Sequence, residues 1–185
     1  MSLTDVDICN SALTKVGAER ITSLTEESER ARIMAEQYPK LRDKLLRSHP
    51  WNFAIERLTL ALSVGTPAFE FTYKFAIPND CLRILQIDSR EKWQKEGEYI
   101  VSNSPTVGIK YIKKITDTSK YDASFAEALA AAIAADVSYS LVQSVTLKDA
   151  LLKEAEQALR TARSFDAQEG TPQQVIADDW LTVRY

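Results

Sequence analysis

Residues 122–145 read DASFAEALAAAIAADVSYSLVQSV, and this alanine-rich run predicts a long helix that packs against other helices. Asp122 or Ser124 can cap its first turn, and the helix should reach about Val145. Its larger apolar side chains gather on one face, and the alanines between them let a neighbouring helix approach closely. The facing residues are Phe125, Leu129, Ala132, Ile133 and Leu141.

A second helix follows directly and should run from Thr146 to about Ser164. Its apolar stripe has helical spacing and consists of Leu147, Leu151, Ala155, Ala158 and Ala162. Two helices joined by so short a link form an antiparallel pair, so we expect a helical hairpin here.

Two more helices are predicted before residue 50. The first starts at Thr4, whose hydroxyl can accept from the backbone near Asp7, and it stops at Gly17. The second should run from Glu26 to Ser48, with Thr25 or Ser23 as its cap and the acids Glu26, Glu27 and Glu29 in its first turn. Pro39 lies inside it, so we expect a kink or break at Tyr38.

The middle of the chain is rich in β patterns. Apolar residues alternate over 51–55 and then over 58–62 in the opposite phase, which indicates a bulge or a helix-to-strand change near Glu56. Cleaner alternation over 69–77 predicts a half-buried strand, and 82–87, 99–101 and 107–111 read as further strands. Four or five short strands predict a small antiparallel sheet or partial barrel.

These elements define an α+β fold that is mainly α. About four helices, from 4–50 and 120–165, should form a bundle, and 51–119 should form a β-rich insertion. The chain has only 5 glycines and 6 prolines among 185 residues, which favours long helices over a loop-rich scaffold.

Residues 166–185 lack a periodic stripe yet carry many apolar side chains. These are Val175, Ile176, Trp180, Leu181, Val183 and Tyr185. One interpretation is a docking tail that becomes ordered on a neighbouring protein, and the other is packing against the chain's own domain.

The charge balance argues against tight nucleic-acid binding. The net charge is -3, with 23 basic and 26 acidic residues mixed along the chain, and a phosphate-binding surface needs a clustered basic face. One small cluster consists of Lys110, Lys113, Lys114 and Lys120. It could contact DNA or an acidic partner, or it could be the solvated edge of a sheet.

No arrangement of residues indicates an enzyme. The single histidine, His49, lies at a helix end and suits capping or packing, and the acids Glu26 and Glu27 suit a helix start. Cys9 and Cys81 are far apart and lie among apolar residues, so we expect free thiols in a reducing compartment. Glycine-rich phosphate loops are absent from the sequence, as are metal-ligand spacings. We therefore expect no catalytic residue, no cofactor and no metal.

No apolar run approaches the roughly 20 residues that a membrane span requires, so we expect no membrane association. Without a recognisable signal peptide at the start, the protein is expected to be made and kept in the cytoplasm.

Three segments together resemble a known family. DICNSALTKVG at 7–17, followed by ITSLTE at 21–26 and the helix after it, resembles the opening of the tail tubular protein A family of podophages. HPWNFA at 49–54 is similar to that family's exit into its β domain, and YKFAIPNDCLRIL at 73–85 is similar to its strand-turn-strand core. The similarity covers roughly residues 5–87.

The resemblance implies a head-to-tail adaptor, or gatekeeper, of the virion that is made in the bacterial host. Such a subunit forms a dodecameric ring beneath the portal protein and continues the DNA channel to the downstream tail or nozzle protein, without sequence-specific DNA binding. In isolation it can be monomeric. The family brings no catalytic residues. The expected interface residues are Trp180, Leu181 and Tyr185 as tail anchors, with Val175 and Ile176 beside them.

Two other classes stay open. One is a helical binding module of a prophage or bacterium that contacts DNA or a protein partner. The other is a tail-associated wall hydrolase, which would need a carboxylate essential for lysis.

Overall fold

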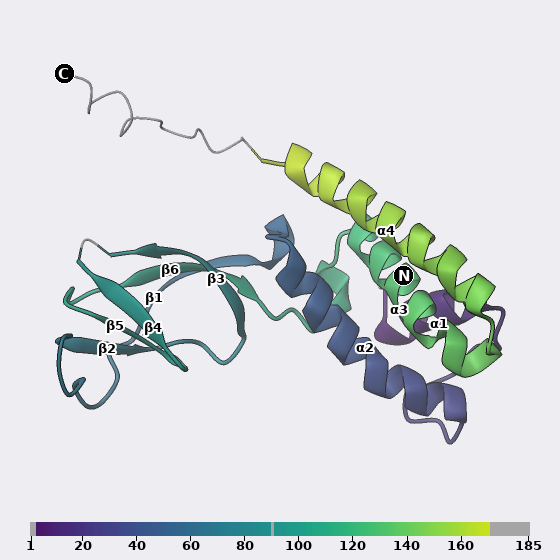
Figure 1. Ribbon diagram of the computed structural model, residues 1–185, viewed down its shortest axis with the longest axis horizontal. Helices are drawn as coiled ribbons and strands as arrows, with labels where there is room; N and C mark the ends of the chain where they lie inside the picture. Colours follow the sequence, from purple (N-terminus) through teal and green to yellow (C-terminus); the bar gives the residue numbers. More distant parts are fainter. Residues whose placement is uncertain (1–2, 90, 171–185) are drawn as a thin grey trace.

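The computed structural model describes residues 3–89 and 91–170. A β part and a helical part follow one another along the long axis of the molecule (Figure 1). In these residues the fold class is α+β and mainly α, with four α-helices and two small antiparallel sheets. The five candidate anchors of the C-terminal tail, Val175 to Tyr185, lie outside the described residues.

The first helix, α1 (Asp5–Val16), begins and ends as predicted. The Thr4 hydroxyl accepts from the Asp7 backbone N–H at 3.1 Å, and the Asp7 carboxylate accepts in return from the Thr4 N–H at 3.0 Å. This reciprocal pair satisfies two helix-end donors. Gly17 closes the helix at φ 79°, a left-handed conformation that glycine adopts without a Cβ penalty.

Helix α2 (Glu29–Ser48) starts three residues later than predicted. Ser28 is its cap, not Thr25 or Ser23, and its hydroxyl accepts from the Ala31 N–H at 3.2 Å. The prediction of Glu26 and Glu27 as helix-start acids was wrong, because both precede the cap and only Glu29 lies in the first turn. The Glu26 carboxylate bonds backward, accepting from the Thr22 N–H at 2.9 Å. That bond stabilises the preceding loop in a non-helical conformation.

No break occurs at Pro39, and α2 runs through it to Ser48. His49 is the C-cap of α2, in keeping with its predicted place at a helix end.

Helix α3 (Ala123–Val142) is the centre of the helical part and packs against each of the other three helices. Asp122 caps it through bonds from the backbone N–H groups of Ser124 and Phe125. Gln143 then adopts φ 54°, which turns the chain directly into α4 (Val145–Gln168). The predicted hairpin is confirmed, although Ser144 is the cap of α4 and the helix continues four residues past Ser164.

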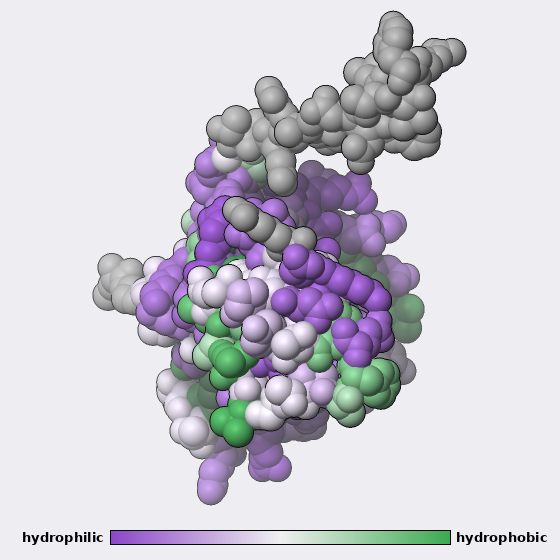
Figure 2. Space-filling view, turned by 90° about the vertical axis from the view of Figure 1, so that its left-hand side faces the viewer, coloured by the Kyte–Doolittle hydropathy of each residue, from purple (hydrophilic) through white to green (hydrophobic). Residues whose placement is uncertain are grey.

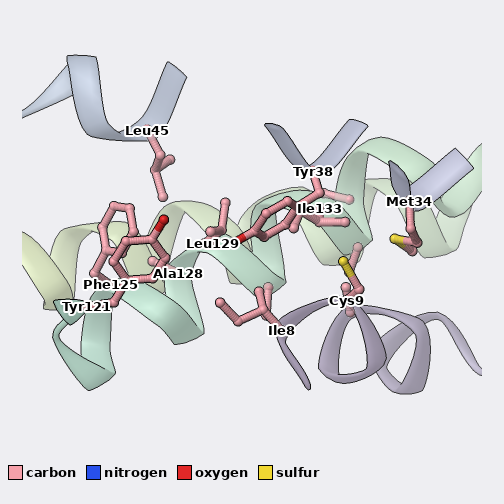
Figure 3. Close-up of a cluster of buried hydrophobic side chains, with 14 of the residues drawn as sticks. Ile8, Cys9, Met34, Tyr38, Leu45, Tyr121, Phe125, Ala128, Leu129 and Ile133 are labelled. Carbon is pink, nitrogen blue, oxygen red and sulfur yellow. The ribbon is translucent and has the colours of Figure 1, made fainter. Parts of the chain in front are cut away.

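A single apolar core joins the helices. Figure 3 shows side chains of α1, α2 and α3 pointing toward one another, among them Ile8, Met34, Leu129 and Ile133. Trp51 extends this core toward the β part, with 1% of its surface exposed and its ring edge-on to Phe125 at 5.0 Å.

The β part consists of two three-stranded antiparallel sheets. One sheet has the order β1 (Ile55–Thr59), β6 (Gly108–Lys113), β3 (Cys81–Asp88), and the other has the order β2 (Tyr73–Ala76), β5 (Tyr99–Ser102), β4 (Trp93–Glu96).

Residues just after β1 connect the two sheets. The Leu60 N–H donates to Val107 O, and the Ser63 N–H then donates to Lys74 O at the start of β2. Leu60, Phe75, Ile100 and Ile109 form a second apolar cluster that both sheets share. This arrangement matches the predicted partial barrel better than a single flat sheet.

Several strand boundaries differ from the prediction. Residues 52–54 form a short 3-10 helix (Asn52–Ala54), so the change from helix to strand occurs at Ile55, close to the expected place. The strand predicted from 69 begins only at Tyr73, because Glu70 has φ 69° and the Phe69 side chain is 80% exposed. Strand β4 was not predicted, since its residues are exposed on both faces and show no alternation.

By length and composition α3 is apolar enough to cross a membrane, and 61% of its most apolar window is buried inside the protein. Packing against α1, α2 and α4 accounts for this apolar composition.

Candidate protein-binding site

An apolar groove runs between α2 and α4, and α3 forms its floor. Figure 1 shows α3 lying between these two helices. The hollow has a volume of about 500 Å³. Its apolar lining comes from all three helices and consists of Leu41, Leu45, Ala128, Ala132, Ala135, Leu152, Ala155 and Leu159. We call this surface the α2–α4 groove.

The groove exists because its floor is made of alanines. A methyl side chain lets α2 and α4 each pack close to α3 but leaves the space between them unfilled. The Leu152 side chain stands at the wall of this space with 44% of its surface exposed. An apolar hollow with a half-exposed leucine on its wall is typical of a site where another apolar segment binds.

Charged side chains surround the groove. Lys44 of α2 and Lys148 of α4 stand on its rim, as do Asp136 of α3 and Glu156 of α4. In the described part of the chain neither lysine has a carboxylate oxygen within 4.0 Å. The rim can therefore bind carboxylates of an incoming segment.

On its other side α4 is held in place by an ion cluster. The Lys15 ammonium of α1 contacts Glu127 of α3 at 2.7 Å and Glu154 of α4 at 2.6 Å. The hydrogen bonds to Glu127 and Glu154 raise the pKa of Lys15. One side chain thus links three helices and fixes one wall of the groove.

The C-terminal end of α4 is fixed to the junction with the β part. The Asp166 carboxylate lies 3.1 Å from His49 Nε2 and accepts from the Asn52 N–H at 2.8 Å. The Asn52 amide in turn donates to the Asp166 carbonyl at 2.6 Å. His49 also packs edge-on against Trp51 at 4.7 Å. These contacts give His49 the packing role expected from its position and make α4 a firmly held wall.

The four lysines of the predicted basic cluster are spread over several surfaces. Lys113 contacts Glu56 at 2.7 Å, and Lys114 contacts Asp43 at 2.7 Å. Lys110 lines a hollow formed by residues of β1, β3 and β6, and Lys120 is exposed at the end of a short 3-10 helix, Thr118–Lys120. Two of the four charges are therefore neutralised by neighbouring acids, which reduces their attraction for phosphate.

A second set of exposed apolar side chains lies on the β part. Leu62, Val64 and Phe69 in the β1–β2 connection are 60%, 101% and 80% exposed. Figure 2 looks onto this end of the molecule and shows hydrophobic residues separated by hydrophilic ones. On this face the hydrophobic residues therefore do not form one continuous patch.

The two cysteines of the chain lie in different surroundings. Both cysteines are free, Cys9 in the core and Cys81 half-buried at the start of β3. Burial raises the pKa of Cys9 to about 12, with a smaller contribution from Asp5. Within residues 3–89 and 91–170 no group of three or more His, Cys, Asp or Glu side chains could hold a metal ion.

The sequence predicted close helix packing at the alanines of α3 but not the groove. The alanines of α3 were expected to admit a partner helix, and α1, α2 and α4 fill that role only in part. Leu152 and Leu159 were missed because they lie off the stripe predicted for α4. With Ala155 and Lys148 they form a second row at spacings of three and four, which is the signal that could have found the groove.

No protein-family model matches the chain, and no curated protein matches it either.

Proposed function

We propose that this chain is a non-enzymatic structural subunit of a tailed-phage virion, which forms a ring at the junction of head and tail. In that position it binds the portal protein on one side and the downstream tail or nozzle protein on the other. The DNA passes through the ring without sequence-specific contacts. This proposal joins the family resemblance of residues 5–87 to the surface features described above.

The observation that carries the proposal is the α2–α4 groove. A helical bundle that leaves an apolar hollow of about 500 Å³ uncovered by residues 3–89 and 91–170 has a surface suited to a further apolar segment. Repeated contacts between such a surface and a segment of the next subunit generate a closed ring when the rotations between subunits add up to a full turn without a rise along the axis. The groove thus supports assembly from many copies.

The charge of the protein fits a DNA channel. The net charge is -3, and two of the candidate lysines are held in ion pairs with Glu56 and Asp43. A surface that does not retain phosphates lets DNA slide past it. This property also argues against the alternative of a DNA-gripping module of a prophage or bacterium, whereas a module that binds a protein through the α2–α4 groove remains the competing proposal.

Negative-stain electron microscopy of the protein mixed with the portal protein of the same phage or prophage tests the proposal. We expect rings of this chain stacked on one face of the portal ring. A gel shift on random duplex DNA is the companion measurement and should show no tight binding at physiological salt. Absence of any association with the portal at all concentrations, with or without tight DNA binding, would contradict the adaptor function and favour the binding module.

A further inference from the structure

The α2–α4 groove has a shape and a chemistry that a particular segment of this chain matches. Its wall on α4 extends from Lys148 to Leu159, which is about 16 Å of helix at 1.5 Å per residue. Its lining is apolar along this length, with Leu152 left 44% exposed. An occupant must therefore carry several apolar groups over a similar distance.

Residues 175–185, VIADDWLTVRY, meet this requirement. Even as a helix, eleven residues span about 16 Å. The segment has two pairs of apolar side chains, Val175 with Ile176 and Trp180 with Leu181. Residues 177–179, two of them aspartates, separate the pairs. A tryptophan in an apolar pocket is a frequent anchor of protein interfaces.

The charges match as well. The segment carries charges of both signs, Asp178 and Asp179 between its apolar pairs and Arg184 after them. The rim of the groove also carries both signs, with Lys44 and Lys148 on opposite helices and Asp136 and Glu156 as acids. Neither lysine has a carboxylate oxygen within 4.0 Å in the part of the chain that the structure describes. Opposite charges at the rim of an apolar contact fix its register and orientation.

The route of the chain favours a second copy as the source of this segment. Helix α4 continues to Gln168, nine residues or about 14 Å past Leu159. To enter its own groove, the chain would have to reverse and return over this distance within residues 169–174, whose full extension is about 20 Å. The return would use most of that length and leave little for the turn itself.

We infer that the α2–α4 groove of one subunit binds residues 175–185 of a second copy of this chain. This inference rests on the proposed ring and names the contact that builds it. Passing a terminal segment from each subunit to the next gives a head-to-tail interface, which closes into a ring when the rotations add up to a full turn without a rise along the axis.

Cross-linking between two differently marked chains tests the inference. One full-length chain carries Leu152→Cys in the groove, and a second, with a mass tag, carries Ala177→Cys in the segment. Both chains also carry Cys81→Ser, which removes the half-buried native thiol. After mixing, with and without the portal protein, a short bismaleimide should join the two chains. As the matched control, Gln157→Cys places the thiol on α4 beside a different hollow, away from the groove, and should give little product. Trp180→Ala in the tagged chain should lower the cross-linked fraction at least roughly tenfold.

Other outcomes would overturn the inference. If a chain carrying both Leu152→Cys and Ala177→Cys is joined only within itself, the segment binds its own groove. If cross-linking is absent under both conditions, or equal for Gln157→Cys, the segment does not bind there. Rings on the portal without the cross-link would refute this contact alone, whereas the absence of both would refute the proposed function too.

Discussion

At the scale of single residues, the two cysteines differ sharply in their surroundings. The Cys9 thiol is fully buried between α1 and its neighbours, and burial raises its pKa to about 12, whereas Cys81 is half-buried at a strand start. Because the thiolate is the reactive form, a low thiolate population and poor access both slow the reaction of Cys9 with thiol reagents.

We therefore expect an aromatic disulfide reagent at pH 8 to modify one thiol per folded chain, at Cys81, and two in guanidinium chloride. Mass spectrometry after digestion identifies the modified position. Rapid labelling of Cys9 under native conditions would show that the core around α1 is not packed as described. A Cys81→Ser variant serves as the control and should show almost no labelling while folded.

A second prediction at this scale concerns acid. Hydrogen bonds lower the pKa of Asp7, mainly from the Thr4 side chain, and of Glu26, mainly from the Thr22 backbone. Groups with a lowered pKa in the folded state stabilise the protein above their unfolded values of 3.8 and 4.5, and this contribution is lost as the pH falls through the folded values.

Urea midpoints should consequently fall between pH 5 and pH 2, and Asp7→Asn should show a smaller fall than the wild type. Asp149→Asn is the matched control, since that exposed side chain forms no hydrogen bond among the described residues. Equal pH dependence of Asp7→Asn and the wild type would argue against the capping box as a source of acid sensitivity.

At the scale of the elements, Pro39 is the least expected feature. A proline inside a helix removes one backbone hydrogen bond and crowds the preceding turn, yet α2 continues through it. The buried stripe of α2, which includes Met34, Tyr38 and Leu45, holds the helix against α3 on both sides of the proline. Tertiary packing therefore outweighs the local preference.

Replacing this residue should strengthen the helix. Pro39→Ala restores a donor and is expected to raise the free energy of unfolding by about 1–3 kcal/mol, measured from urea denaturation. Gln37→Ala, two residues earlier in the same helix, is the control and should leave the free energy of unfolding nearly unchanged. An unchanged or lower stability for Pro39→Ala would mean that the proline ring itself makes an important contact.

The helices were more predictable than the strands, for a physical reason. Caps such as Thr4 and Asp122 and stripes such as that of α1 are local signals, and the structure uses them as the sequence suggests. Strand limits depend on partners distant in sequence. Phe69 continues the alternation of β2 toward the N-terminus. It lies before Tyr73, the first residue of β2 that pairs with a partner strand, so it stays exposed.

The candidate site could be predicted only in part. The alanine run of α3 indicated close helix packing, but which helices cover which alanines depends on the crossing of α2 and α4 over α3. Ala132, for example, lies in the predicted facing set, and in the structure it forms part of the groove floor. A pattern of apolar residues therefore shows that a face is used without showing what fills it.

At the scale of the whole molecule, the helical part is held together from several sides while one apolar surface remains open. Lys15 links α1, α3 and α4, and Asp166 ties α4 to the start of the β part. These contacts keep α4 in place whether or not the groove is filled. Filling the groove is then expected to change assembly more than it changes the stability of the subunit.

The most direct test is ring assembly on the portal protein by a variant with an altered groove. Leu152→Glu places a charge on the apolar wall, and Gln157→Glu adds the same charge elsewhere on α4. Both chains should fold with similar urea midpoints, but only Gln157→Glu should form rings in electron micrographs. Rings formed equally well by Leu152→Glu would contradict the claim that the α2–α4 groove builds the assembly.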